Sequence, residues 1–228
     1  MDAITNLFRQ RMKLHPEWFR SDQIFFGDSA PSMLWTRDKF ERFKNFEPDR
    51  HGLGKWLPGG ATDLFEGKTP LLCQILKKWE VDIDEIYFPW NVKDNHWVAL
   101  MISLPKRHIT VWDSIPNYLK ENVLSASIEP VAVIVPYLHR FMADINDRYR
   151  YSFAHFTHEY ISGGDVLAQD NATDCGVYRL KFIDYHSLGM LFPRTLCGKN
   201  MRAIRAKLAA EIHHEINCRG PLERNWDD

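Results

Sequence analysis

The sequence predicts an α+β fold, in which a mixed or antiparallel central sheet is flanked by helices. Three short segments with strand character follow one another in the middle of the chain, and turn-forming residues separate them. Segments with helical periodicity precede and follow these strands. In addition, Cys175 stands directly before an apolar run that stops at Gly189, so we expect this cysteine to begin a buried helix.

Length and composition exclude several classes of protein. The 228 residues are 45% apolar, which is enough for a substantial core in one domain, or in one domain with an appendage. With 29 basic and 30 acidic residues the formal net charge is -1, so neither nucleic acid nor an anionic membrane surface is expected as a partner. No apolar run reaches the ~18 residues that a membrane span needs, and no secretion signal is evident.

The four cysteines stand apart from one another, without the spacing of a disulfide framework. We therefore expect a reducing compartment and an intracellular protein, in the nucleus or the cytoplasm. We also expect a monomer that needs no cofactor. A zinc site from Cys218, His213 and His214 has little support, because adjacent histidines on a helix point about 100° apart. No metal is expected.

The first third of the chain has the weakest pattern. Short apolar runs alternate with a loop rich in Gly and Pro from Pro48 to Gly60, and one helix is expected over Met33–Phe43. From Thr69 the pattern sharpens, because Thr69 is a good N-cap and Pro70 suits the first helical position. Apolar residues then share one face as far as Trp79, which predicts an amphipathic helix of about three turns.

The predicted sheet follows this helix. Its strands are expected over Glu85–Trp90, Trp97–Leu104 and His108–Trp112, and their short separators favour antiparallel neighbours. The middle strand is apolar without alternation, so both of its faces should be covered. Helices packed on the two faces of the sheet would provide that cover.

The second half of the chain continues the alternation of helix and strand. Residues 119–145 have helical spacing, although Pro136 must start or kink a helix there. Tyr149–Phe156 has the character of another strand, and 162–165 of a turn. A last helix is expected over Lys199–Ile216, where apolar residues form one stripe.

A cysteine at a helix start is chemically suggestive. The unpaired N–H groups and partial positive charge there favour thiolate over thiol, and can bring a cysteine pKa from about 8.5 to roughly 3.5–7.5. Taken alone, Cys175 is better explained as a small buried apolar residue, as most free cysteines are. Whether it is a nucleophile depends on whether the chain also supplies a base, an orienting acid and an oxyanion donor.

Three residues can fill those roles. His96 precedes the middle strand and Asp113 ends the next one, so antiparallel pairing would bring them together at one end of the sheet. The carboxylate would then orient the imidazole, whose other nitrogen can take the proton of Cys175. Gln169, six residues before the cysteine, can donate its amide to a developing oxyanion together with the Cys175 backbone N–H. Each residue alone has an ordinary structural explanation, but the four together favour nucleophilic catalysis.

At these residues the sequence resembles the cysteine proteases that act on SUMO and related ubiquitin-like proteins, which share a clan with the adenovirus protease. In that family the histidine is followed by Trp, the aspartate by Ser, and the nucleophile stands in Asp-Cys-Gly with a glutamine six positions earlier. The matching segments here are Phe88-Pro89-Trp90-Asn91, His96-Trp97, Trp112-Asp113-Ser114, Gln169, Asn171, Asp174-Cys175-Gly176-Val177-Tyr178 and Met201-Arg202.

The resemblance implies an adenain-like cysteine proteinase with residues 69–228 as the catalytic domain and residues 1–68 as an N-terminal segment packed on it. It implies a Cys175, His96 and Asp113 triad with Gln169 as oxyanion donor, cutting after the Gly-Gly end of a ubiquitin-like protein, in deconjugation or in precursor processing. Trp97 would help to form a narrow tunnel for that tail, although an aromatic residue in a strand is usually part of the core.

The sequence also departs from the family pattern. The Trp-Leu-Asn-Asp motif that normally begins the domain is absent in that form, and Trp35 and Trp56 are both candidates for its tryptophan. The stretch between Asp113 and Cys175 suggests an insertion around residues 120–160. Divergent members of this kind occur among plant and transposon-associated proteins.

Two other functions remain open. Acyltransferases of the kind made by bacterial effectors resemble these proteases in using a similar His, acid and Cys set, and an acetyl-CoA transfer assay would separate the two. A decayed protease that binds a ubiquitin-like protein without cutting it is the third hypothesis. The intact set of four residues argues against decay.

Overall fold

The computed structural model describes residues 2–35, 37–45, 66, 68, 77–79, 81–93, 96–162, 168–169 and 173–218. These residues form a five-stranded mixed sheet in the order β1-β2-β3-β4-β5. The middle three strands are antiparallel, whereas β1 and β5 run parallel to their neighbours. The predicted α+β fold with helices around a mixed sheet is therefore confirmed. The strands are β1 (Ile24–Phe26), β2 (Glu85–Val92), β3 (His96–Ser103), β4 (His108–Asp113) and β5 (Thr157–Ser162).

The three predicted strands are β2, β3 and β4, and their predicted ends are within two residues of the observed ones. In the antiparallel register Phe88 pairs with Leu100, and Leu100 pairs with Val111. Val98, Ala99 and Leu100 of β3 are all fully buried, as the unbroken apolar run of this strand predicts. Both faces of the middle strand are thus covered.

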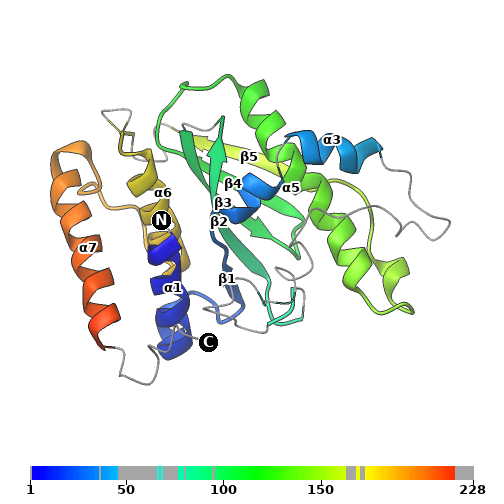
Figure 1. Ribbon diagram of the computed structural model, residues 1–228, viewed down its shortest axis with the longest axis horizontal. Coiled ribbons are helices and arrows are strands. Elements are labelled where there is room, and N and C mark those ends of the chain that lie inside the picture. The colour runs from blue at the N-terminus through cyan, green and yellow to red at the C-terminus, as the bar shows by residue number, and fades with distance from the viewer. Residues whose placement is uncertain are drawn as a thin grey trace, which may run out of the picture.

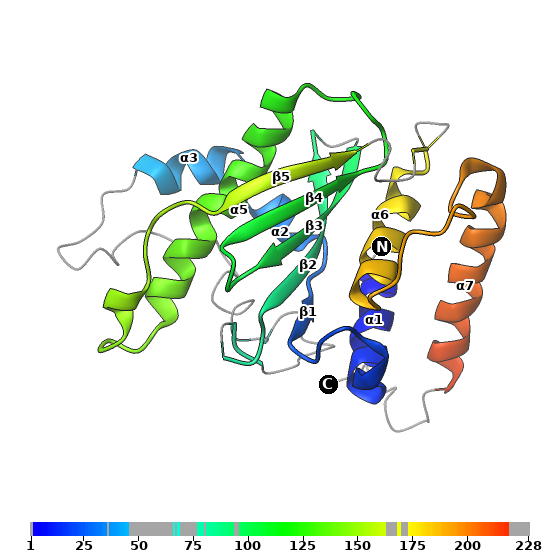
Figure 2. The same cartoon turned by 180° about the vertical axis from the view of Figure 1, so that it is seen from behind.

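Helices cover the two faces of the sheet in separate layers (Figures 1 and 2). One face carries α5 (Glu121–Met142) and α3 (Arg37–Asn45), and their apolar residues form one core with β2, β3 and β4. The other face carries α6 (Cys175–Ser187), which packs on β3, and α1 (Asp2–Leu14), which packs on α6. Beyond them, α7 (Met201–Cys218) packs against α1. Among the described residues, no helix is long and apolar enough to cross a membrane.

The helix expected over Met33–Phe43 is two helices instead, and this prediction was wrong. The first, α2 (Ala30–Leu34), ends where the Trp35 N–H bonds to the Pro31 carbonyl over 2.8 Å. Trp35 itself leaves the helical conformation, with φ -96° and ψ 43°, and its side chain is buried against Trp90. Burial of this indole in the core turns the chain before α3 begins.

Pro136 neither starts a helix nor ends one, because α5 runs through both Pro130 and Pro136. A proline in a helix leaves the carbonyl four residues earlier without its usual N–H partner. Here the backbone N–H of Phe156 supplies the missing donor to the Ala132 carbonyl over 3.0 Å. Phe156 also lies just before β5, so the same hydrogen bond ties this helix to the edge of the sheet.

The strand expected over Tyr149–Phe156 was also wrong. Residues Arg148–Arg150 form the 3-10 turn η3, and the strand begins only at Thr157. As an edge strand with half or more of its residues exposed, β5 is largely polar and lacks the apolar pattern by which a buried strand is recognised. The turn expected at 162–165 lies outside the described residues except for Ser162, the last residue of β5.

The predicted last helix is α7, which follows the 3-10 turn η5 (Gly198–Asn200). Met201 and Leu208 of its apolar stripe are buried. The predicted helix over Thr69–Trp79 lies outside the described residues apart from its end, where Trp79 is buried and bridges to Ile83. The described N-terminal residues join the fold through β1 and α1, while the division of the chain at residue 68 stays a prediction.

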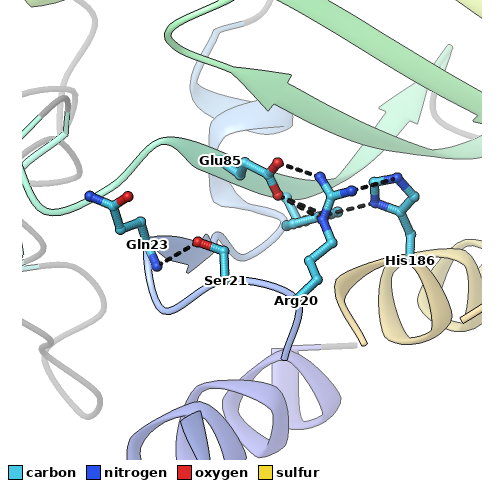
Figure 3. A network of polar contacts seen from close by, with 6 residues as sticks. Arg20, Ser21, Gln23, Glu85 and His186 are labelled. Atoms are coloured by element: carbon cyan, nitrogen blue, oxygen red, sulfur yellow. Dashed lines mark hydrogen bonds and ion pairs between the residues drawn. The ribbon is translucent and has the colours of Figure 1, made fainter. Parts of the chain in front are cut away.

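A polar network connects the N-terminal part to the sheet and to α6 (Figure 3). Arg20, which follows the 3-10 turn η1 (Pro16–Trp18), bonds through Nε to Glu85 over 3.0 Å. The Tyr87 hydroxyl is 2.7 Å from Nδ1 of His186, in the last turn of α6. The network therefore joins three elements that lie far apart in the sequence.

Candidate active site

The first pair of site residues meets at one end of the central strands. His96 begins β3 and Asp113 ends β4, and because these strands are antiparallel both residues lie at the same end of the sheet. Nε2 of His96 is 2.9 Å from Oδ1 of Asp113, and both side chains are buried. The same Oδ1 accepts the backbone N–H of Ile115 over 2.9 Å, which holds the carboxylate in place.

Cys175 is the first residue of α6, as predicted, and is buried. Hydrogen bonding with the His96 side chain and with the backbone of Trp97 and Gly176 lowers the pKa of its thiol, so all three groups lie around the sulfur. Since Nε2 of His96 faces Asp113, it is Nδ1 that is left for Cys175. The structure thus brings Cys175, His96 and Asp113 together in one buried cluster.

The electrostatics of this cluster favour an ion pair. Burial by itself would raise the pKa of Cys175, but the hydrogen bonds from His96 and from the Trp97 backbone outweigh burial and lower that pKa below its ordinary value. Burial likewise opposes the charge on His96, yet the hydrogen bonds to Asp113 and Cys175 raise its pKa to about 9. Both pKa shifts therefore favour the thiolate and imidazolium forms over the neutral pair.

Gln169 is anchored to the residue that follows Asp113. Its backbone N–H donates to the Ser114 carbonyl over 2.8 Å, and the Ser114 hydroxyl donates to Oε1 of Gln169 over 2.9 Å. With its oxygen on Ser114, the Gln169 amide is held in one orientation. Sequence reasoning identified Gln169 but missed this role of Ser114.

Trp97 is half-buried beside the cysteine, and a second missed residue lies against it. The guanidinium carbon of Arg179 is 4.0 Å from the centroid of the Trp97 ring. Arg179 is 1% exposed, although it carries a charge in a run that is otherwise mostly apolar. A basic residue four positions after the cysteine was the signal that could have drawn attention to it.

Two more residues that the sequence did not single out support the site. Tyr118 packs its ring on His96 with the centroids 4.9 Å apart, which shields one face of the imidazole. Arg205 of α7 forms an ion pair with Asp174, the residue before the cysteine, and also bonds to the Thr173 carbonyl over 3.0 Å. Arg205 of α7 therefore holds the residues before α6 in place.

The family follows from comparison with known proteins. The model of the Ulp1 protease family, C-terminal catalytic domain, matches residues 1–220 of this chain. The chain belongs to the Ulp1 protease family. It is thus a cysteine peptidase domain, and the resemblance inferred from the sequence motifs is confirmed. No curated protein matches the chain.

Several solved structures have the same fold at low sequence identity. The C-terminal Ulp1 protease domain in complex with Smt3, the yeast ortholog of SUMO, is 17% identical with a TM-score of 0.58 over 95% of this chain and 77% of its own. The SUMO protease Ulp1 with its catalytic cysteine oxidized to a sulfonic acid is also 17% identical, with a TM-score of 0.60 over 95% and 78%. The Xanthomonas campestris effector protein XopD bound to ubiquitin is 18% identical, with a TM-score of 0.50 over 92% and 87%.

The tryptophan of the missing N-terminal family motif has two candidates in this Ulp1 family chain. Trp35 is 2% exposed and packs on Trp90 inside the core, so it is not presented at the surface. Trp56 lies outside the described residues. The choice between them stays open.

Proposed function

We propose that the chain cleaves the bond that follows the C-terminal Gly-Gly of a SUMO-type ubiquitin-like protein. The observation that carries this proposal is the buried His96–Asp113 hydrogen bond beside Cys175 at the start of α6, where His96 lowers the pKa of the thiol. A thiolate held beside an imidazolium, with the ring fixed by a carboxylate, is the arrangement that nucleophilic catalysis by cysteine requires.

In the first half of the reaction the Cys175 thiolate attacks the carbonyl carbon of the last glycine and forms a C–S bond. The carbonyl oxygen becomes an oxyanion, which accepts hydrogen bonds from the Gln169 amide and from the Cys175 backbone N–H, a donor that lacks an intrahelical partner. The His96 imidazolium then gives its proton to the leaving amine as the C–N bond breaks. A thioester and a neutral imidazole result.

The second half returns the enzyme to its starting state. His96 takes a proton from water as the water attacks the thioester carbon, and Asp113 stabilises the imidazolium that forms. When the C–S bond breaks, the carboxylate product leaves and Cys175 is a thiolate again. The same two charged groups thus stand ready for the next substrate.

The substrate class rests on two kinds of support. Solved proteins with the same fold include a Ulp1 protease domain bound to Smt3 and an effector protein bound to ubiquitin. In this chain, Trp97 stands next to His96 and is half-buried beside Cys175, where it can restrict the approach of a substrate tail. We therefore propose ubiquitin-like proteins and their conjugates as partners of a monomeric enzyme, and the nucleus or cytoplasm as its location.

Covalent capture tests the proposal directly. A panel of ubiquitin-like proteins, each with a thiol-reactive group at its C-terminus, is offered to the wild type and to Cys175→Ala. We expect one or a few members to form an adduct with the wild type at Cys175 and none with the variant. If no ubiquitin-like protein reacts while the enzyme transfers an acetyl group from acetyl-CoA, the acyltransferase hypothesis replaces the protease.

A further inference from the structure

Arg179 is a buried cation one helical turn after the nucleophile. It is 1% exposed, and within the described part of the chain none of Nε, Nη1 and Nη2 has a hydrogen-bond partner. An unpaired charge in the interior is costly, and substitution by an apolar side chain of similar size is often neutral or stabilising. Packing therefore does not explain why a guanidinium stands here.

The direction of the side chain points to the start of α6. Residues four apart lie on the same face of a helix, and long helical side chains lean toward the N-terminus, so Arg179 extends toward Cys175. Its guanidinium lies over the ring of Trp97, 4.0 Å from the centroid, and the backbone of Trp97 is close enough to Cys175 to lower the pKa of its thiol. The indole thus fixes the cation next to the thiolate.

The carboxylates around this site interact with other partners. Asp113 of β4 bonds to His96, Asp174 pairs with Arg205 of α7, and Asp2 of α1 accepts the Ser29 hydroxyl over 3.0 Å. Among the groups that couple electrostatically to Arg179 are Asp2 and Cys175. Cys175 is the one of these two that lies on the same helix, one turn away.

We propose that Arg179 is a second, permanent cation of the site that stabilises the Cys175 thiolate together with His96. The two cations differ in one respect. His96 loses its charge when it protonates the leaving amine, whereas Arg179 keeps its charge through the cycle. Although burial lowers the pKa of Arg179 to about 10, the group is still charged at neutral pH.

The role of Arg179 in turnover rests on the proposed function, but its effect on the thiolate does not. Thiolate stability is measured without any substrate, from the pH dependence of alkylation of Cys175 by iodoacetamide. Mass spectrometry of the Cys175 peptide separates its reaction from that of the other cysteines. A failure to cleave ubiquitin-like proteins would overturn the proposed function and leave this measurement intact.

Arg179→Met removes the charge and keeps most of the volume. We expect the pKa of Cys175 to rise by about one unit, the size expected for unit charges roughly 6–8 Å apart in a medium of intermediate polarity. Arg179→Lys should retain most of the effect, and Arg202→Met, which removes the same charge from an exposed position on α7, should have none. The melting temperature of Arg179→Met should be equal to that of the wild type or a few degrees higher.

The His96→Ala background gives the decisive comparison. Because Arg179 acts independently of His96, adding Arg179→Met to His96→Ala should again raise the pKa of Cys175 by a similar amount. An unchanged pKa in folded Arg179→Met, or an effect that vanishes without His96, would overturn the proposal. If Arg179→Met does not fold, Arg179→Gln, which keeps a polar group, provides the same comparison.

Discussion

Ser114 donates its hydroxyl hydrogen to the amide oxygen of Gln169 over 2.9 Å and accepts the Gln169 backbone N–H at its carbonyl over 2.8 Å. Ser114 directly follows Asp113 and is 2% exposed, so the residue that aligns the histidine and the residue that aligns the glutamine are neighbours in the chain. One buried turn after β4 thus orients two parts of the proposed catalytic machinery.

We predict that Ser114→Ala lowers kcat with little change in KM, because the Gln169 amide loses the bond that defines its orientation. Gln169→Ala should lower kcat by about 10²–10³-fold, the usual effect of losing one oxyanion donor, and Ser114→Ala by less. In the Gln169→Ala background, Ser114→Ala should have almost no further effect, since the two residues act as a unit. If the double variant lost kcat by the product of the two single losses, Ser114 would not act through Gln169.

Asp113→Asn tests how the histidine is held. Oδ1 of Asp113 faces both the Ile115 N–H and Nε2 of His96. An Asn oxygen at this position would hold the ring without the negative charge that stabilises the imidazolium, and an Asn NH2 there would place the imidazole proton on Nδ1. Nδ1–H cannot accept the thiol proton of Cys175, so we expect a large loss of kcat in a folded enzyme, smaller than that of His96→Ala. Circular dichroism controls for folding. Full activity of Asp113→Asn would contradict the role of Asp113 in the triad.

Much of this site could be predicted because its geometry is local. Antiparallel pairing of two short strands brings His96 and Asp113 to one end of the sheet, and a cysteine before an apolar helical run must lie at a helix start. Sequence pattern alone therefore brought these residues together, as it did the three central strands.

Other features depend on contacts that sequence pattern does not encode. The parallel pairings of β1 and β5 join segments far apart in the chain, and β5 is too polar to be recognised as a strand. Arg179 stands in a helix that is buried on nearly every side, so periodicity gave no reason to separate it from the core. Its contact with Trp97 became visible only in the packed structure.

His186 should make the stability of the protein sensitive to mild acid. Burial, together with the positive charge of Arg20, lowers its pKa to about 4, from an ordinary value of 6.5. The unfolded chain therefore takes up a proton at higher pH than the folded protein, and stability that is complete above pH 6.5 is lost as the pH falls toward 4. Because the ring is partly exposed, we expect a loss of roughly 1 kcal/mol between pH 7 and pH 5.

Urea unfolding at the two pH values measures this loss, and His186→Gln is the control. The amide cannot titrate in this range, so the variant should lose less stability than the wild type between pH 7 and pH 5. An equal loss in the two proteins would mean that other groups carry the pH dependence. The contacts of His186 with Tyr87 and Arg20 would then have no part in it (Figure 3).

The specificity of the enzyme should depend on Trp97, whose ring packs against Arg179 and whose backbone lies beside the nucleophile. If this indole forms one wall of a narrow tunnel, a Cβ on the substrate residues next to the scissile bond would collide with it, while the chemistry at Cys175 is indifferent to that atom. The wild type should then cut a tail that ends in Gly-Gly and fail to cut tails that end in Gly-Ala or Ala-Ala. Trp97→Ala should relax this discrimination and lower the overall rate, because a tunnel also keeps the carbonyl at attack distance, where a displacement of about 1 Å can cost 10²-fold.

The measurement compares kcat/KM for the three tails in the two proteins, after thermal melting has established that the variant is folded. Equal cleavage of Gly-Gly and Ala-Ala tails by the wild type would mean that no such tunnel exists, and would favour an acyl transfer function for the same three residues.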